Sequence, residues 1–202
     1  MKVTLIDYGA GNVASVERAL QRLGAESQRA AAPESLGSAE ALILPGVGHF
    51  AALIRALDER GLRAPLLKAL RRGVPFLGIC LGLQALYDSS EEAPELHGLR
   101  IFHGRIRALP ASVKLPHMGW NQLRLVGKSR LLQGIAPEAH FYFAHSYAVA
   151  ADTTAHSVAT CTHGSEFLAV LEQDNINAVQ FHPEKSGAPG AQLLSNFLRL
   201  AA

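Results

Sequence analysis

The sequence lacks the features that mark several large classes of protein. Its 202 residues include only two cysteines, Cys80 and Cys161, which lie far apart and outside any C-x-x-C spacing. We therefore expect neither a metal site nor a disulfide framework. No apolar run approaches the ~20 residues of a membrane-spanning helix. The net charge is only +2 and no Lys/Arg run forms a basic arm, so nothing indicates a nucleic-acid partner.

The N-terminal residues also lack the pattern of a targeting segment. Met1 and Lys2 lead directly into the strand-like run Val3–Asp7, so we expect no leader peptide and a cytoplasmic protein with reduced thiols. Hydrophobic residues make up 49% of the chain and charged residues 18%, which is typical of a compact globular protein. This length can bury one sizeable core, so we expect a single domain spanning residues 1–202.

The first half of the chain alternates short apolar runs with helical patterns, as βαβ units do. Strands are expected at Val3–Ile6, Ala41–Leu44 and Val74–Ile79. Helical spacing follows them at 13–23, at 49–72 with breaks near Gly61 and Pro65, and at Leu81–Tyr87. Such alternation predicts a parallel sheet that is covered by helices on both faces.

The second half contains shorter strand-like runs separated by turns. They are Leu99–Phe102, Ile106–Leu109, Gln122–Val126, Phe141–Phe143, Thr154–Cys161, Phe167–Leu171 and Ile176–Gln180. A helix is expected at Gly190–Leu200, and no repeat or linker separates the two halves. The fold class predicted is α/β, a single domain with a mixed, mainly parallel central sheet flanked by helices.

The strongest chemical signal is Gly78-Ile79-Cys80-Leu81-Gly82, between an expected buried strand and a helix. It is the thiol counterpart of the G-x-S-x-G nucleophile elbow, in which glycines permit a tight strand-to-helix turn. Such a turn presents Cys80 at the edge of the sheet and at a helix N-terminus, where a thiolate is favoured. The alternative is a buried cysteine in a glycine-flanked turn.

A thiol nucleophile needs a base, and the base needs an orienting group. His182 lies in Gln180-Phe181-His182-Pro183-Glu184, where the proline favours an extended conformation of the residue before it. In an extended segment residues 182 and 184 share one face, so Glu184 is placed to hold one ring nitrogen of His182. Taken alone, His-Pro-Glu is more typical of a polar surface turn, and only its pairing with the elbow favours the catalytic interpretation.

Two glycine-rich turns follow other expected strands. Pro45-Gly46-Val47-Gly48 could direct backbone N–H groups into a pocket, with the N–H of Leu81, as an oxyanion hole. Gly9, Gly11 and Ala14 satisfy G-x-G-x-x-G/A, the dinucleotide fingerprint. That fingerprint needs a carboxylate after the next strand, and residues 27–30 read Ser-Gln-Arg-Ala, so it is incomplete.

Together these residues resemble a known family. Gly78–Gln84 with Phe181–Glu184 is similar to the class I (triad) glutamine amidotransferases. Within that family, further segments are similar to the glutaminase subunits of imidazole glycerol phosphate synthases: Asp7–Asn12, Pro45–Gly48, Pro116–Asn121, His145–Tyr147 and Pro183–Ser186. Because the likeness runs in order from Ile6 to the last helix, the set of motifs is specific.

The resemblance implies roles for individual residues. Cys80 would be the nucleophile, His182 the base and Glu184 its orienting group. The oxyanion hole would come from Val47 or Gly48 with Leu81. The implied contacts with substrate glutamine are Gly46, Gln84, Ser146 and Tyr147. No cofactor and no metal are implied.

The resemblance also implies a partner, a (β/α)8-barrel synthase subunit that receives the ammonia. The barrel would combine ammonia with a ribonucleotide intermediate of histidine synthesis, giving imidazole glycerol phosphate and a carboxamide ribonucleotide. The residues expected to face the barrel in the heterodimer are Asp7, Tyr8, Gly11, Asn12, Trp120, Asn121, Tyr142 and Lys185.

Three alternatives remain open at this point. A dinucleotide-binding oxidoreductase would need the missing carboxylate, and titration with NAD(P) would test it. A non-catalytic interaction protein on the same fold would lack an alkylatable thiolate at Cys80. Within the family, the chain could serve another synthase, such as anthranilate synthase, although the segments around Trp120 and Lys185 argue against it.

Overall fold

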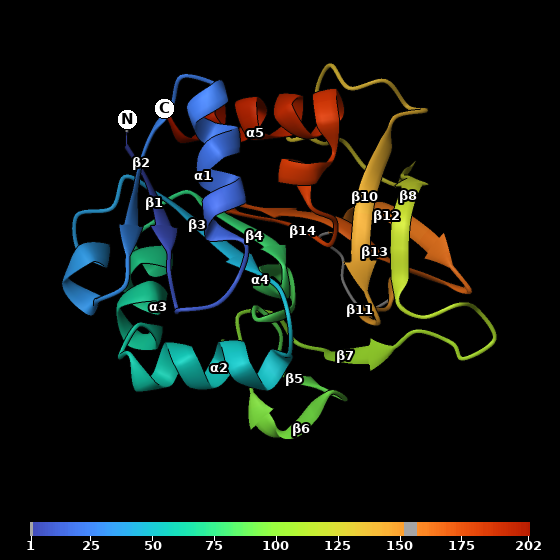
Figure 1. The fold of residues 1–202 in the computed structure, drawn as a ribbon, viewed down its shortest axis with the longest axis horizontal. Coiled ribbons are helices and arrows are strands. Elements are labelled where there is room, and N and C mark those ends of the chain that lie inside the picture. Colours follow the sequence, from blue (N-terminus) through green and yellow to red (C-terminus); the bar gives the residue numbers. More distant parts are fainter. Residues whose placement is uncertain (1, 152–156) are drawn as a thin grey trace.

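The computed structural model describes residues 2–151 and 157–202 (Figure 1). An eight-stranded sheet runs through the molecule. In spatial order its strands are β2 (Glu26–Ala30), β1 (Lys2–Ile6), β3 (Ala41–Gly46), β4 (Phe76–Cys80), β14 (Ile176–Val179), β13 (Ser165–Gln173), β12 (Ser157–His163) and β9 (Arg124–Leu125). The first five are parallel and the last three are added antiparallel. The sheet is therefore mixed and mainly parallel, as predicted.

Helices cover both faces of the parallel part (Figure 1). One face carries α1 (Val13–Arg22) and α5 (Gly187–Ala201), and the other carries α2 (Phe50–Glu59) and α3 (Arg63–Arg71). Successive residues of β3 show why: Ile43 lies in the same cluster as Val16 of α1, and Leu42 in the cluster with Leu57 of α2. Because side chains alternate along a strand, a sheet covered on both faces needs continuous apolar strands.

Smaller elements complete the fold. They are β10 (His140–His145) paired with β8 (His117–Gln122); a sheet of β11 (Tyr147–Val149), β7 (Arg105–Ala108), β5 (Ser89–Ser90) and β6 (Ala93–His97); the short helix α4 (Leu81–Gln84); and the 3-10 turns η1 (Pro33–Leu36) and η3 (Pro183–Lys185). Within the described part of the chain, no helix is long and apolar enough to cross a membrane.

Two predictions fail next to the elbow. The helix expected at 81–87 ends at Gln84, and the strand expected at Leu99–Phe102 is a loop. The helix ends because the N–H groups of Leu86 and Tyr87 donate to the carbonyls of Leu83 and Gln84, only three residues back, in a tighter turn than an α-helix has. The N–H of Leu99 donates to the carbonyl of Ala85, and the N–H groups of Ile101 and Phe102 donate to that of Leu86, so this segment folds onto the end of the elbow and does not pair as a strand.

Other boundaries differ in smaller ways. The strand expected at Gln122–Val126 is replaced by the end of β8 and the short β9. The 49–72 helix is broken at Gly61, which has a φ of 65°, while Pro65 lies inside the first turn of α3. Of the strand expected at Thr154–Cys161, residues 154–156 lie outside the described part, and the rest is found in β12.

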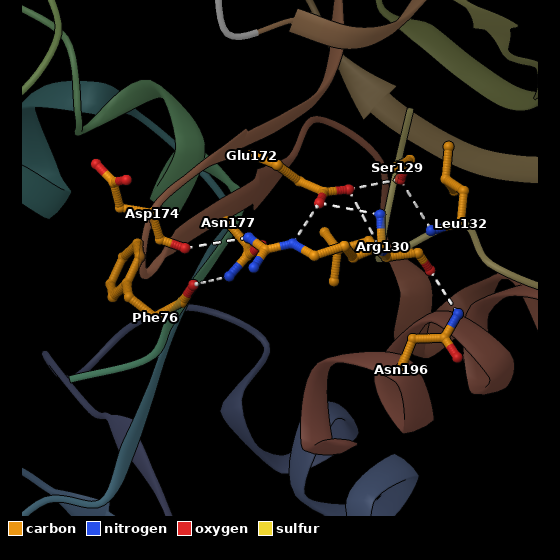
Figure 2. A network of polar contacts seen from close by, with 9 residues as sticks. Phe76, Ser129, Arg130, Leu132, Glu172, Asp174, Asn177 and Asn196 are labelled. Carbon is orange, nitrogen blue, oxygen red and sulfur yellow. Dashed lines mark hydrogen bonds and ion pairs between the residues drawn. The ribbon is translucent and has the colours of Figure 1, made fainter. Parts of the chain in front are cut away.

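A polar network fixes the edge of the sheet where the parallel strands begin (Figure 2). Glu172 of β13 accepts hydrogen bonds from Ser129 Oγ and from the N–H groups of Arg130 and Leu131. Asn196 of α5 donates to the carbonyl of Leu131 at 2.7 Å. The 129–132 turn is thereby attached to both the sheet and the last helix.

Candidate active site

Cys80 is the last residue of β4 and directly precedes α4. Its φ of 54° and ψ of −105° are unusual for a residue with a side chain, and such backbone strain concentrates at functional sites. The thiol is almost completely buried, yet Cys80 lines a cavity at the C-terminal edge of the parallel strands. The local geometry is that of a nucleophile elbow.

The glycines of the elbow are required by close backbone contacts. A Cβ atom at Gly78 would lie 2.6 Å from the carbonyl oxygen of Gly82, and one at Gly82 would lie 1.9 Å from that of Leu44. Both distances are impossible for real side chains, so only glycine lets α4 pack against β3 and β4. The tight turn predicted from the G-x-C-x-G spacing is confirmed.

His182 and Glu184 meet behind the thiol. Nδ1 of His182 lies 2.9 Å from Oε1 of Glu184, and the two side chains are only 1% and 0% exposed. His182 is extended, as its position before proline predicts, but Glu184 lies in the 3-10 turn η3. The contact is therefore made through a turn, and the expected strand-like alternation of residues 182 and 184 is wrong. Asn12 donates to the same Glu184 oxygen at 2.9 Å.

Electrostatics link these groups into one unit. Burial alone would lower the pKa of His182, but its contacts with Cys80 and Glu184 outweigh burial and raise that pKa above its usual range. Burial would likewise raise the pKa of Glu184, but His182 and Asn12 hold it below its ordinary value. His182 Nε2 has no hydrogen bond of normal geometry among the described residues, although Cys80 is close enough to act on its charge. The arrangement favours a protonated His182 beside Cys80.

Sequence reasoning missed Gln180, which also reaches the sulfur. Its Nε2 lies 3.5 Å from Cys80 Sγ, and its Oε1 accepts a hydrogen bond from Gln84 Nε2 at 3.1 Å. The same Gln84 nitrogen donates to the carbonyl of Tyr147 at 2.8 Å. The signal was present in the sequence, because Gln180 lies two residues before His182, on the same side of an extended segment.

The thiol opens onto a cavity of about 190 Å³. Its lining residues are Val47, Gly48, Cys80, Leu81, Gln84, Glu92, Pro116, Ala144, His145, Ser146 and Tyr147. The fold thus brings together the residues expected at the oxyanion hole and most of those expected to bind substrate. Gly46 differs, since a Cβ there would lie 2.5 Å from Leu81 Cβ, which puts this glycine beneath the elbow.

Glu92 lines the cavity, and the sequence did not reveal it. It lies in an acidic stretch that has no distinguishing pattern. Its Oε2 accepts the N–H of Phe50 at 2.7 Å, at the N-terminus of α2, and its Oε1 lies 4.0 Å from His49 Nε2. The carboxylate is thereby held in a fixed orientation at the cavity wall.

The residues expected at a partner surface separate into two groups. Trp120 is 56% exposed, its ring lies 5.9 Å from that of Tyr142, and Lys185 Nζ lies 5.7 Å from the centre of the Tyr142 ring. Tyr8 was expected at the partner surface, but it is buried: it is only 2% exposed, and burial raises its pKa to about 12. Its hydroxyl oxygen lies beneath Gly11, where a Cβ would be 3.0 Å away.

Three more residues expected at the partner surface, Asp7, Asn12 and Asn121, make hydrogen bonds or ion pairs within this chain. Asn12 is half-buried against Glu184, and Asn121 donates to the carbonyl of Thr162 at 3.0 Å. Asp7 is half-buried, accepts the N–H of Gly9 and pairs with Arg29 at 3.8 Å. Arg29 stands near the end of β2, where a dinucleotide fold would need a carboxylate for the ribose.

In residues 2–151 and 157–202, no group of three or more His, Cys, Asp or Glu side chains is arranged to hold a metal ion. Cys161 is buried in the core, as expected from its apolar surroundings, and burial raises its pKa to about 12. Such a thiol stays protonated and is a poor nucleophile at neutral pH.

Comparison with known proteins agrees with this geometry. Residues 4–201 match the family model described as glutamine amidotransferase class-I. The chain is 46% identical over 198 residues to the imidazole glycerol phosphate synthase subunit HisH of Methanothermobacter thermautotrophicus, covering 98% of each sequence. It is also 46% identical over 200 residues to the HisH subunit of Deinococcus radiodurans, covering 98% of this chain and 93% of that one.

Solved structures support the fold. A structure described as a glutamine amidotransferase superposes with a TM-score of 0.78 at 22% identity, over 98% of each chain. PurLQS from Thermotoga maritima superposes with a TM-score of 0.75 at 19% identity, over 100% of this chain and 99% of the other. The chain belongs to the class-I glutamine amidotransferase family and, within it, to the family of imidazole glycerol phosphate synthase HisH subunits.

Proposed function

We propose that this chain, as one glutamine amidotransferase domain of residues 1–202, is the glutaminase subunit of an imidazole glycerol phosphate synthase. It hydrolyses glutamine to glutamate and ammonia. The observation that carries the proposal is the buried Cys80–His182–Glu184 set at the wall of a cavity that Gln84 also lines. Family membership and full-length similarity to HisH subunits support the same activity.

The reaction proceeds through a thioester. The Cys80 thiolate attacks the carboxamide carbon of glutamine, and the carbonyl electrons move onto oxygen. His182, protonated on Nε2, gives that proton to the leaving nitrogen, so ammonia departs and the thioester forms. Water then attacks the thioester with His182 as base, releasing glutamate and restoring the thiolate. Glu184 keeps Nδ1 protonated and oriented throughout.

The cavity supplies the other requirements of this chemistry. N–H groups of Leu81 and of the 47–48 loop stabilise the oxyanion, and one such donor is typically worth about 3 kcal/mol. Glu92 is a fixed carboxylate at the wall, suited to the α-ammonium group of an amino acid. Gln84, Ser146 and Tyr147 bind the rest of glutamine.

A synthase partner follows from the product. Free ammonia is protonated in water and then ceases to be a nucleophile, so the cavity mouth has to be covered. We propose a (β/α)8-barrel subunit that docks over the exposed Trp120 with Tyr142 and Lys185, near Asp7, Gly11 and Asn121. Since the nucleophile is a thiol, we propose the reducing cytoplasm as its compartment.

The Cys80→Ala variant tests the proposal. It should release no glutamate above background in the complex, while the partner still makes product from added ammonium salt. Partner binding should be unchanged, because the thiol is buried. Substantial glutamate release by this variant would show that another nucleophile acts, and failure of the wild-type complex to release glutamate would exclude the function.

A further inference from the structure

A chain of buried hydrogen bonds runs from β8 to the glutamine pocket, and the triad does not use it. Asn121 Nδ2 lies 3.3 Å from His117 Nε2, and His117 Nδ1 lies 3.1 Å from His145 Nε2. His145 Nδ1 lies 2.9 Å from the carbonyl oxygen of Tyr147. His117 and His145 are only 4% and 6% exposed, so water does not compete for these contacts.

The groups at the two ends determine which atom donates and which accepts in each of these hydrogen bonds. The Tyr147 carbonyl can only accept, so Nδ1 of His145 must carry a proton, and the Nε2 of a neutral His145 must accept from His117. At the other end, Asn121 Nδ2 donates to the Thr162 carbonyl while Asn121 Oδ1 accepts the N–H of Gln122. Its amide orientation is therefore determined, and it donates to Nε2 of His117.

Each link thus requires a neutral imidazole with its proton on Nδ1. A second proton on either ring would set two N–H groups against each other. Burial lowers the pKa of His145 to about 3 and that of His117 to about 4, so both rings stay neutral at neutral pH. His163, stacked on His117 at 4.2 Å, contributes to both reductions in pKa, and His117 and His182 contribute to that of His145.

This chain of hydrogen bonds ends at the cavity wall, close to the Cys80 sulfur. The Tyr147 carbonyl that accepts from His145 also accepts from Gln84 Nε2 at 2.8 Å. Gln84 donates in turn to Gln180, whose amide nitrogen lies 3.5 Å from Cys80 Sγ. A carbonyl with two donors has its direction fixed, and with it the wall of the cavity next to Ser146.

We propose that His117 and His145 are positioning residues for the glutamine pocket, an inference that rests on the proposed function. As neutral imidazoles protonated on Nδ1, they hold the Tyr147 carbonyl in place beside Gln84. The same two residues connect β8, the strand that carries Trp120, to the substrate cavity.

The first test is spectroscopic and needs no activity. Long-range proton–nitrogen spectra of the full chain with labelled histidine distinguish Nδ1–H from Nε2–H rings. Both His117 and His145 should show the Nδ1–H form at neutral pH, which is the minor tautomer of free histidine in water. An Nε2–H form or an imidazolium at either residue overturns the proposal, whether or not the chain proves to be a glutaminase.

The second test is kinetic, on the complex with its synthase partner. His117→Phe keeps a ring in the stack but leaves Nε2 of His145 without a donor, so KM for glutamine should rise about tenfold while kcat changes less than about twofold. His117→Asn, whose Nδ2 replaces Nδ1 as donor, should recover most of the affinity. A KM unchanged in a folded His117→Phe variant overturns the proposal.

His163→Phe is the matched control. The His163 ring stacks on the ring of His117. Its Nε2, however, donates to the carbonyl of Lys114, which is not part of the chain of hydrogen bonds. KM should stay at the wild-type value. A rise equal to that of His117→Phe would show that ring packing alone sets the pocket, and would overturn the positioning role.

Discussion

The two edges of the central sheet each bury a glutamate side chain, and they use its oxygens differently. At the edge where the parallel strands begin, Glu172 is 6% exposed and both of its oxygens accept hydrogen bonds (Figure 2). At the edge where they end, Glu184 is fully buried, and a single oxygen serves both His182 and Asn12. The carboxylate of Glu172 thus has both oxygens filled, whereas that of Glu184 holds the imidazole of His182 and the amide of Asn12 through one oxygen.

The largest effect should come from breaking the pair at the proposed catalytic edge. His182→Ala removes the base and should lower kcat roughly 10⁴-fold or more in the complex. Glu184→Gln leaves the base and removes only orientation and charge, so its loss should be roughly tenfold smaller. Steady-state glutamate release measures both, and a Glu184→Gln loss equal to that of His182→Ala would contradict the assigned order of roles.

A change at Glu172, on the opposite edge, should lower the stability of the fold and leave the catalytic rate unchanged. Glu172→Ala leaves the N–H groups of exposed Arg130 and buried Leu131 without their acceptor, which should cost about 2 kcal/mol in the free energy of unfolding, most of it at Leu131. Once folded, the variant should keep the wild-type kcat. Urea denaturation and glutamate release, measured on the same sample, separate the two quantities.

Glu166→Ala is the matched control for this effect. Glu166 also pairs with an arginine, Arg124, but its side chain is 38% exposed. Because solvent screens this pair, Glu166→Ala should lose much less stability than Glu172→Ala. Equal losses for Glu166→Ala and Glu172→Ala would mean that burial of the carboxylate does not set the size of the effect.

A smaller effect is expected at the surface next to the proposed catalytic edge. Trp120 is exposed and supported by Tyr142, so Trp120→Ala should weaken association with the synthase partner by at least about 1 kcal/mol. Leu125→Ala, at a residue 53% exposed on β9, should leave association unchanged. Titration calorimetry on both variants decides whether the partner docks on this side, and a stronger effect of Leu125→Ala would move the interface.

The smallest effect concerns the dependence of stability on pH. The pKa of folded Glu184 is held below 4.5, so its contribution is present above about pH 4.5 and is lost as pH falls through the lower, folded value. The raised pKa of His182 acts in the opposite sense: its contribution is full below about pH 6.5 and is lost as pH rises through the raised value.

Unfolding of wild type and Glu184→Gln across this range should therefore show wild type losing its relative stability on the acid side. A difference that does not vary between neutral and acid pH would contradict the lowered pKa of Glu184.

Much of the elbow could be predicted from the sequence because short-range sterics decide it. Glycine is the only residue type that fits at positions 78 and 82, where β4, α4 and β3 approach closely. Likewise, Pro183 sets the extended conformation of His182 before it. The βαβ alternation gave the parallel sheet for the same reason, since periodicity is a local property. Leu99–Phe102 failed because its N–H groups bond to the elbow region, a contact that no local pattern encodes.

By itself, then, the sequence determined the α/β class, the strained thiol turn, and the residues that form the proposed triad. Only the tertiary structure decided that Tyr8 is buried, that Glu92 lines the pocket and that Gln180 contacts the Cys80 sulfur. It alone also decided that His117 and His145 are joined by a hydrogen bond. The reason is separation along the chain: 28 residues divide the two histidines and 100 divide Gln180 from Cys80. Pairings of that range depend on which strands the sheet brings together.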